Sequence, residues 1–258
     1  MKNILICILS LILGFPLIAQ NKGLEIAQQA HDLDEGFNAY EVELTMILKN
    51  ANGQESTRAM NSQTLEMAND GDKSMISFME PKDIKGTAML TYSHRTESDD
   101  QWLFLPSIKR VKRISSNNKS GPFMGSEFAY EDLGSQEVEK YTYEFIKEEQ
   151  NGTDNIALVD RFPNDTKSGY SKNRVYYNLN QNYRIDKIEF FDRKGSLLKT
   201  LNYLDYQLYK DKHWRANVLE VLNHQSKKET KLIFKDYNFD VDLSESDFTQ
   251  NSLKRAGR

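Results

Sequence analysis

Residues 40–49 read Tyr-Glu-Val-Glu-Leu-Thr-Met-Ile-Leu-Lys, and their side chains alternate between apolar and polar for most of the stretch. Because successive side chains of a strand point to opposite faces, this alternation predicts a β-strand with one buried face and one wet face. Asn52-Gly53 follows directly. Both residue types tolerate positive φ, so this pair predicts a tight hairpin that returns the chain beside the first strand.

The same pattern continues along the chain. It predicts further strands at residues 57–68, 74–79, 87–94, 101–105, 141–149, 156–162, 174–179, 184–191, 197–208, 214–222 and 230–239. Turn-forming residues separate these segments at short intervals, which is typical of an antiparallel meander and not of βαβ units. The fold class is therefore mainly β with a few helices.

Roughly ten to twelve strands are too many for a flat open sheet, which tends to curl or split. A sandwich, a closed barrel and a half-barrel are all compatible with the pattern, and the regular alternation favours one continuous curved sheet with a polar outer face. Leu24, Ala27, Ala30 and Leu33 recur at helical spacing before Gly36, so a helix precedes the first strand. Ser244 and Asp247 resemble a capping box for a short terminal helix.

The N-terminus has the three parts of a signal peptide. Met1-Lys2-Asn3 carries one positive charge, residues 4–18 carry none, and Ala19 precedes the polar Gln20-Asn21-Lys22. The alternative is a membrane anchor, but the run is short for a span of ~20 apolar residues and Pro16 interrupts it. We expect cleavage near Ala19, export across an inner membrane to the periplasm, and one domain over residues 20–258.

Composition excludes several kinds of function. Cys7 is the only cysteine and lies inside the apolar run, so the mature chain would have no disulfide, no thiolate metal site and no cysteine nucleophile. The formal net charge is −4, and an acidic balance argues against general nucleic-acid binding, which depends on contacts to phosphates. No second apolar run approaches membrane-spanning length, so a cleaved product is expected to be soluble.

Catalytic patterns are absent from the sequence. His31, His94, His213 and His224 share no metal-ligand spacing, and each is expected at the surface. There is no nucleophile elbow, phosphate loop or glycine fingerprint. Glu131 and Asp132 are adjacent, but neighbours in a strand point to opposite faces and would not cooperate as acid and base. We therefore predict no enzyme activity, no metal and no cofactor.

A basic run at Ile108-Lys109-Arg110-Val111-Lys112-Arg113-Ile114 follows directly after Trp102-Leu103-Phe104-Leu105-Pro106. One interpretation is a solvated edge strand, because positive charges on an edge discourage aggregation. The other is a charged rim of Lys109, Arg110, Lys112 and Arg113 beside an apolar surface, suited to an anionic headgroup or an acidic partner. The sequence favours neither.

Residues 120–133 read Ser-Gly-Pro-Phe-Met-Gly-Ser-Glu-Phe-Ala-Tyr-Glu-Asp-Leu and fit neither a helical nor a strand period. A loop with so many apolar side chains must bury them or offer them to a ligand. It is either folded over the core or is a lid over an apolar cavity. In the second case Gly121 and Gly125 would act as hinges, because glycine adopts backbone angles that other residues avoid.

The stretches 101–114 and 123–133, in this order, closely resemble the hallmark of the LolA-like outer-membrane lipoprotein-sorting family. The signal peptide, the length and the helix before the first strand are also similar, so the resemblance covers the mature chain. It implies an incomplete barrel of antiparallel strands, closed by helices over a hydrophobic cavity. It also implies an association with inner-membrane transporters of the resistance-nodulation-division type.

Two functions from different classes follow. The first is a periplasmic carrier of lipid or lipoprotein acyl chains, expected to be a monomer, with Trp102, Phe104, Phe123, Met124, Phe128 and Tyr130 as cavity or lid residues. The second is a non-enzymatic docking subunit of such a transporter, filled by its own side chains and without lipid cargo. An enzyme of unknown type is a third interpretation, which the lack of any catalytic constellation disfavours. A structure without a cavity for an acyl chain would favour the docking subunit.

Overall fold

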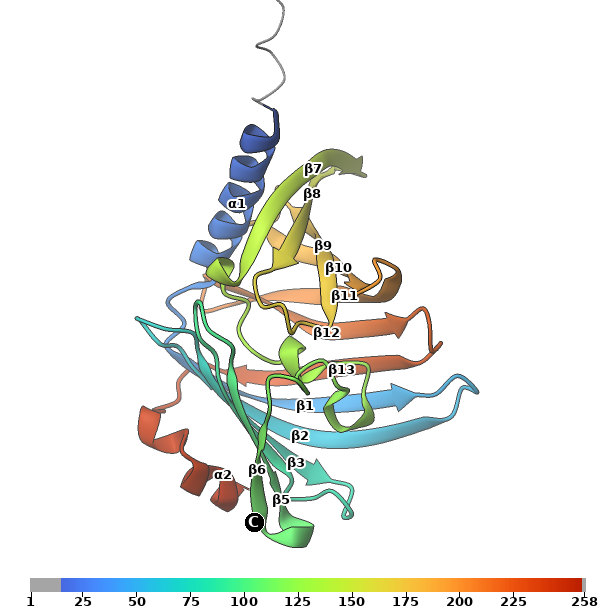
Figure 1. Ribbon diagram of the computed structural model, residues 1–258. Coiled ribbons are helices and arrows are strands. Elements are labelled where there is room, and N and C mark those ends of the chain that lie inside the picture. Colours follow the sequence, from blue (N-terminus) through green and yellow to red (C-terminus); the bar gives the residue numbers. More distant parts are fainter. Residues whose placement is uncertain (1–14, 257–258) are drawn as a thin grey trace, which may run out of the picture.

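The computed structural model describes residues 15–256, with side chains from Asn21 onward. Thirteen strands form one antiparallel sheet in the order β6-β5-β4-β3-β2-β1-β13-β12-β11-β10-β9-β8-β7 (Figure 1). The sheet is not closed into a barrel, because β6 and β7 at its two ends do not pair. The strands are β1 (Ala39–Lys49), β2 (Glu55–Leu65), β3 (Lys73–Glu80), β4 (Ala88–Tyr92), β5 (Asp100–Leu105), β6 (Arg110–Ile114), β7 (Tyr141–Asn151), β8 (Asp154–Pro163), β9 (Tyr170–Asn178), β10 (Arg184–Asp192), β11 (Leu197–Tyr209), β12 (His213–Asn223) and β13 (Glu229–Asn238).

The predicted open, curved antiparallel sheet is thus confirmed, with one strand more than expected because the basic run forms β6. Each predicted strand has a counterpart, and β1 pairs with β2 in the predicted hairpin. The turn covers residues 50–54 and is longer than the tight Asn52-Gly53 turn that was predicted, and of these two residues Gly53 alone has positive φ. The pairing of β1 with β13 joins the two ends of the chain, for example Thr45 with Ile233. Residues 1–14 of the predicted signal peptide lie outside the described residues.

The connection from β6 to β7 has an unusual path. These strands follow each other in sequence but stand at opposite edges of the sheet, so the chain between them must cross one face of it. Figure 1 shows this segment in green, crossing in front of β12, β13 and β1. It contains three short 3₁₀ turns, η2 (Phe123–Gly125), η3 (Tyr130–Asp132) and η4 (Val138–Lys140). We call residues 115–134 the plug, and the face that they cover the inner face.

Helix α1 (Phe15–Asp34) covers the β7 end of the inner face. It packs closely, because a Cβ on Gly23 would stand 2.9 Å from the backbone nitrogen of Phe145. Ile26 and Ala27 are buried in the inner core, but Leu24 and Leu33, on which the helix was predicted, are exposed. The helix was therefore predicted correctly and its buried face only in part. Among residues 15–256 no helix has the length and apolar character of a membrane span.

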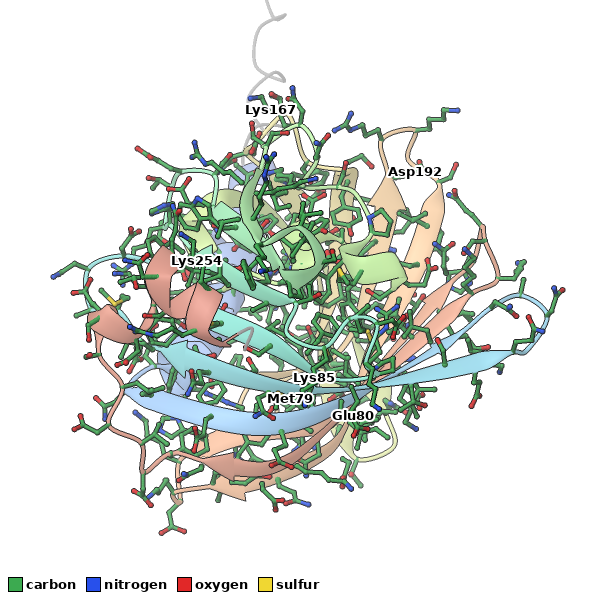
Figure 2. All side chains as sticks on the ribbon, turned by 90° about the horizontal axis from the view of Figure 1, so that it is seen from below. Met79, Glu80, Lys85, Lys167, Asp192 and Lys254 are labelled. Carbon is green, nitrogen blue, oxygen red and sulfur yellow. The ribbon has the colours of Figure 1, made fainter. Side chains whose placement is uncertain are left out.

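Helix α2 (Gln250–Ala256) packs on the opposite, outer face, over β4 and β5. Phe248 and Leu253 are fully buried there against Met75, Ala88 and Leu90. Asp247 accepts a hydrogen bond from the Ser244 backbone N–H at 2.9 Å, so the predicted capping residues stabilise the turn η5 (Glu245–Asp247) that leads into α2. Figure 2 marks this helix by Lys254.

Candidate functional site: the plug and the inner face

The plug buries its apolar side chains in the inner core. Phe123 is 0% exposed and Phe128 is 4% exposed. The Phe123 ring lies 5.8 Å from Phe78 of β3 and 5.7 Å from Tyr130, measured between ring centroids. Met124 and Tyr130 are partly buried against the same cluster. The structure thus brings together four of the six predicted cavity or lid residues, and in this state they fill the inner face themselves.

Trp102 and Phe104 lie elsewhere, and their predicted place in the cavity is wrong. Both belong to the outer-face cluster under α2, where Trp102 makes an edge-to-face contact with Tyr92 at 5.0 Å between ring centroids. The physical reason is the two-residue period of a strand, which sends their neighbours Leu103 and Leu105 to the inner core instead. All four positions are apolar, so alternation could not decide which pair faces the plug.

A buried ion pair fastens the plug to the sheet. Lys199 of β11 lies 2.5 Å from an Asp132 carboxylate oxygen, and the two side chains are only 3% and 7% exposed. Lys199 also donates to the Glu127 carbonyl at 2.8 Å, and its ammonium lies 4.9 Å from the Phe190 ring centroid. Tyr170 donates its hydroxyl to the other Asp132 oxygen at 2.9 Å. Burial first, and then the charge of Asp132, raise the pKa of Tyr170, so this hydroxyl remains a donor.

Further polar contacts hold the plug along its length. Asn223 donates to the Glu127 carboxylate at 2.6 Å, and the Glu127 backbone N–H donates to Thr230 Oγ1 at 2.9 Å. Arg58 donates to the Met124 carbonyl at 2.5 Å, and Gln101 donates to the Tyr130 carbonyl at 2.8 Å. These contacts come from β12, β13, β2 and β5. The plug is therefore attached to many strands, but by non-covalent contacts alone.

Glu131 and Asp132 are not in a strand, as the sequence analysis assumed, but in the turn η3. Glu131 accepts hydrogen bonds from the Ser168 hydroxyl and the Gly169 backbone N–H, both at 2.8 Å. Burial raises its pKa above the ordinary value, although these two donors act in the opposite direction. The two carboxylates have separate partners, so each serves to anchor the plug.

The predicted hinge glycines differ in geometry. Gly125 has φ +79°, and the preceding Met124 is also left-handed, with φ +49°. A Cβ on Gly125 would meet no atom within 4 Å, so the backbone conformation is what favours glycine there. Gly121 has no positive φ, and a Cβ on it would lie 3.1 Å from the Asn118 carbonyl. Their role as hinges stays a prediction.

The basic run forms the edge strand β6, as one of the two interpretations expected. Lys109, Arg110, Lys112 and Arg113 are all exposed. Arg110 and Lys112 pair with Leu105 and Leu103, so they lie on the inner side of the edge, whereas Arg113 lies on the outer side and contacts Asp100. An edge strand and a charged rim are therefore compatible descriptions of the same residues.

Two pockets in the described residues are lined largely by polar groups. One, of about 250 Å³, lies where residues 96–101 and 114–119 meet the β8–β9 turn that Lys167 marks in Figure 2. The other, of about 560 Å³, lies on the outer face beside the end of α2, and includes Glu41, Glu43 and Asp236. Ligand pockets for apolar molecules are mostly apolar and span ~300–1,000 Å³. Neither pocket suits an acyl chain.

Within residues 15–256, no cluster of three or more His, Cys, Asp and Glu side chains could hold a metal ion. The expectation of surface histidines is wrong for His213, which is 5% exposed and packs on Phe37 and Phe239. The other three histidines are partly buried.

The sequence analysis missed Lys199, and its position in β11 could have revealed it. Lys199 points to the same face of its strand as Leu201 and Tyr203, which pack on the inner core. A charged residue on the apolar parity of a strand must be paired in the folded protein, because an unpaired buried charge is strongly unfavourable.

Comparisons with known proteins agree with this architecture. A family model described as an uncharacterized protein matches residues 70–255. The crystal structure of an outer membrane lipoprotein-sorting protein domain from Vibrio parahaemolyticus is 50% identical, with a TM-score of 0.89, covering 92% of this chain and 100% of that chain. No protein with a curated description matches the sequence.

Two more distant structures share the fold. A DUF1329 family protein from Desulfovibrio piger is 24% identical, with a TM-score of 0.86, covering 91% of this chain and 99% of that chain. A LolA superfamily protein from Nitrosomonas europaea is 20% identical, with a TM-score of 0.72, covering 89% of this chain and 98% of that chain. The Vibrio structure, which is 50% identical over 92% of this chain, agrees with the hallmark residues and with the open sheet. The chain therefore belongs to the LolA-like outer-membrane lipoprotein-sorting family.

Proposed function

We propose that the protein is a periplasmic carrier in which acyl chains of a lipid or lipoprotein displace the plug and take its place on the inner face. One observation carries the proposal. Phe123 and Phe128 occupy the inner core as a ligand would, while the plug that bears them is held to the sheet only by side-chain and carbonyl contacts. Membership of a lipoprotein-sorting family supports the same function.

The energies allow such an exchange. Fully burying one large apolar side chain contributes ~1.5–3 kcal/mol, so four such residues would contribute ~6–12 kcal/mol. The plug contributes less than the upper figure, because Met124 and Tyr130 are only partly buried. One long acyl chain contributes ~12 kcal/mol when it leaves water, at about 0.8 kcal/mol per CH₂. Two chains in an empty cavity would exceed the ceiling of about 20 kcal/mol for non-covalent affinity and would not leave. Displacing the plug costs part of the free energy that the acyl chains gain on binding, so the cargo can be released.

The predicted export supports the periplasm as the compartment. Cleavage after Ala19 would leave a mature chain that begins at Gln20, and the intact mass of protein from the periplasmic fraction measures this directly. A mass that includes residues 1–19 would contradict the cleavage. Monomeric carriage across the periplasm would need a membrane partner for loading, because the sequence has no nucleotide motif. We assign contact with that transporter to the exposed rim of Lys109, Arg110, Lys112 and Arg113.

A reversible lock of the plug tests the proposal. The Glu127 backbone N–H lies 2.9 Å from Thr230 Oγ1, so Glu127→Cys and Thr230→Cys place two thiols close together on the plug and β13. Cys7 is the only native cysteine and is expected to leave with the signal peptide, so the new pair has no competitor. Uptake of a fluorescent fatty acid should be lost in the oxidised variant and return on reduction. The single variant Thr230→Cys is the matched control.

The docking subunit remains a second candidate, and the polar character of both pockets favours it. The lock distinguishes the two functions. A carrier loses lipid uptake when the plug is fixed, whereas a docking subunit binds its transporter equally well in the oxidised and reduced forms. Undiminished lipid uptake by the fully oxidised protein would refute displacement of the plug.

A further inference from the structure

A row of polar and aromatic residues crosses the inner face from β7 to β12. Each member pairs in register with the next, so their side chains point to the same side. The members are Tyr143, Arg161, Asn173, Phe190, Lys199 and Asn223. Polar residues on the buried face of a sheet require partners, because burying an unpaired polar group is unfavourable.

The plug supplies partners for one half of the row only. Asp132 pairs with Lys199, and Glu127 accepts from Asn223. Arg161 is 3% exposed, and its one hydrogen bond within the described part of the chain goes from Nη2 to Gln136 Oε1 at 2.8 Å. Its Nε and the Asn173 amide oxygen, which is equally buried, have no partner there.

Nothing around Arg161 in residues 15–256 neutralises its charge. No carboxylate of these residues lies within 4.0 Å of the guanidinium. The titratable groups that act on it are tyrosines, and the guanidinium lies 4.5 Å from the Tyr141 ring centroid. Burial raises the pKa of Tyr203 to about 12, and it also raises the pKa values of Tyr141 and Tyr177. These hydroxyls are therefore neutral near pH 7. They solvate the cation but do not compensate it.

Two residues that contact this cation also line a pocket. Gln136 and Tyr141, which contact the guanidinium, also line the 250 Å³ pocket beside the β8–β9 turn. The two lysines of that pocket are already paired, Lys119 with Asp165 at 2.6 Å and Lys140 with Asp99. Arg161 is thus a cation without a counter-charge in residues 15–256, held by two residues that line this pocket, and it lies on the inner face that acyl chains would cover.

We infer that Arg161 binds the oxyanion of an anionic lipid, a phosphate ester or a carboxylate, whose alkyl chain lies on the inner face. The inference rests on the proposed carrier function and narrows it to cargo with a negatively charged head. A guanidinium presents paired donors that match the oxygens of phosphate and carboxylate. Asn173 lies opposite Arg161 in register and can donate from its amide to the same oxyanion.

Binding of two probes with the same chain tests the inference. Dodecyl phosphate and dodecyl maltoside differ in head charge, and titration calorimetry with the full exported protein measures both. The wild-type protein should bind the phosphate roughly 10- to 100-fold more tightly, as expected for one or two charge-assisted hydrogen bonds. Arg161→Gln should abolish this preference and leave binding of the maltoside unchanged. Arg255→Gln makes the same charge change on the outer face and should keep the preference.

The possible results distinguish the anion site at Arg161 from the proposed carrier function. Equal affinity of wild-type protein for both probes would overturn the anion site and leave the carrier. Failure of both probes to bind would refute the carrier as well. Sodium phosphate that binds as tightly as dodecyl phosphate, and only when Arg161 is present, would identify free phosphate as the source of the oxyanion. A cooperative melting transition of Arg161→Gln shows that this variant is folded. Dodecyl phosphate should raise the Tm of the wild-type protein more than that of the variant.

Discussion

The ion pair between Lys199 and Asp132 offers the sharpest perturbation of the plug. Asp132→Asn keeps the size of the side chain and leaves a lysine that is 3% exposed without a counter-charge. Removing one partner of a buried pair destabilises by about 3–5 kcal/mol. Because the proposed displacement of the plug would expose Lys199 to water, we expect this energy to appear as easier opening of the plug. At 1.4 kcal/mol per factor of ten, opening becomes roughly 100- to 3,000-fold more frequent.

Hydrogen exchange read by mass spectrometry measures this opening. The Phe123 N–H donates to the Phe128 carbonyl at 2.7 Å, and the Ser126 N–H donates to the Phe123 carbonyl at 2.9 Å, so both amides report on the plug. Their exchange should accelerate in Asp132→Asn, while amides of the central strands keep their rates. The control Glu220→Gln breaks the exposed pair with Lys231, which is worth ~0–1 kcal/mol, and should change little.

Two results would refute this reasoning. Plug amides that exchange at the wild-type rate in Asp132→Asn would show that the ion pair does not hold the plug. Equal acceleration in the plug and in β9 would show that the plug opens only with global unfolding. The double variant Asp132→Asn with Lys199→Met removes the unpaired charge, and should restore much of the protection that the single variant loses.

Three further predictions concern other parts of the fold. Burial first, and then the charge of Glu137, raise the pKa of Asp72 from 3.8 to about 7. Between these two pKa values the folded state binds a proton that the unfolded state releases, so stability falls as pH rises from 3.8 to about 7. Asp72→Asn should therefore raise Tm more at pH 8 than at pH 4. A gain of equal size at both pH values would contradict the shift. Gly125→Ala should destabilise the plug by ~1–2 kcal/mol through its φ of +79° alone, seen as faster exchange of plug amides. Phe104→Ala should lower the free energy of unfolding by ~3–5 kcal/mol in urea without changing acyl uptake, and altered uptake would return Phe104 to the ligand surface.

Local periodicity predicted most of this fold. Strands such as β1 alternate clearly, and Gly53, with φ +80°, allows the chain to turn into the hairpin with β2. The pairing of β1 with β13 could not be predicted in this way. It depends on contacts between residues far apart in sequence, which leave no periodic trace within either strand.

The plug was recognised as irregular, and a loop folded over the core was one of its two interpretations, but its course across the sheet and its anchors were not foreseen. Its course follows from the sheet order, which places β6 and β7 at opposite edges, and no local pattern encodes that order. Residues of opposite charge that pair between the plug and the sheet, such as Asp132 and Lys199, are likewise distant in sequence. The strands did carry a partial signal. Lys199 and Arg161 both point to the buried, apolar face of their strands, and a charged side chain on that face needs a partner.

The β1–β13 pairing also determines how the chain can fold. Residues 39–114 and 141–238 each form a meander from adjacent hairpins, and such local contacts form early because they close short loops. The β1–β13 pairing that joins the two meanders is the exception. Thr45 can pair with Ile233 only when β13, which lies far from β1 in sequence, has joined the sheet. Until the last strand arrives, the open side of β1 is an unpaired edge able to add a strand from another molecule. A newly made chain is therefore most prone to self-association just before β13 joins the sheet.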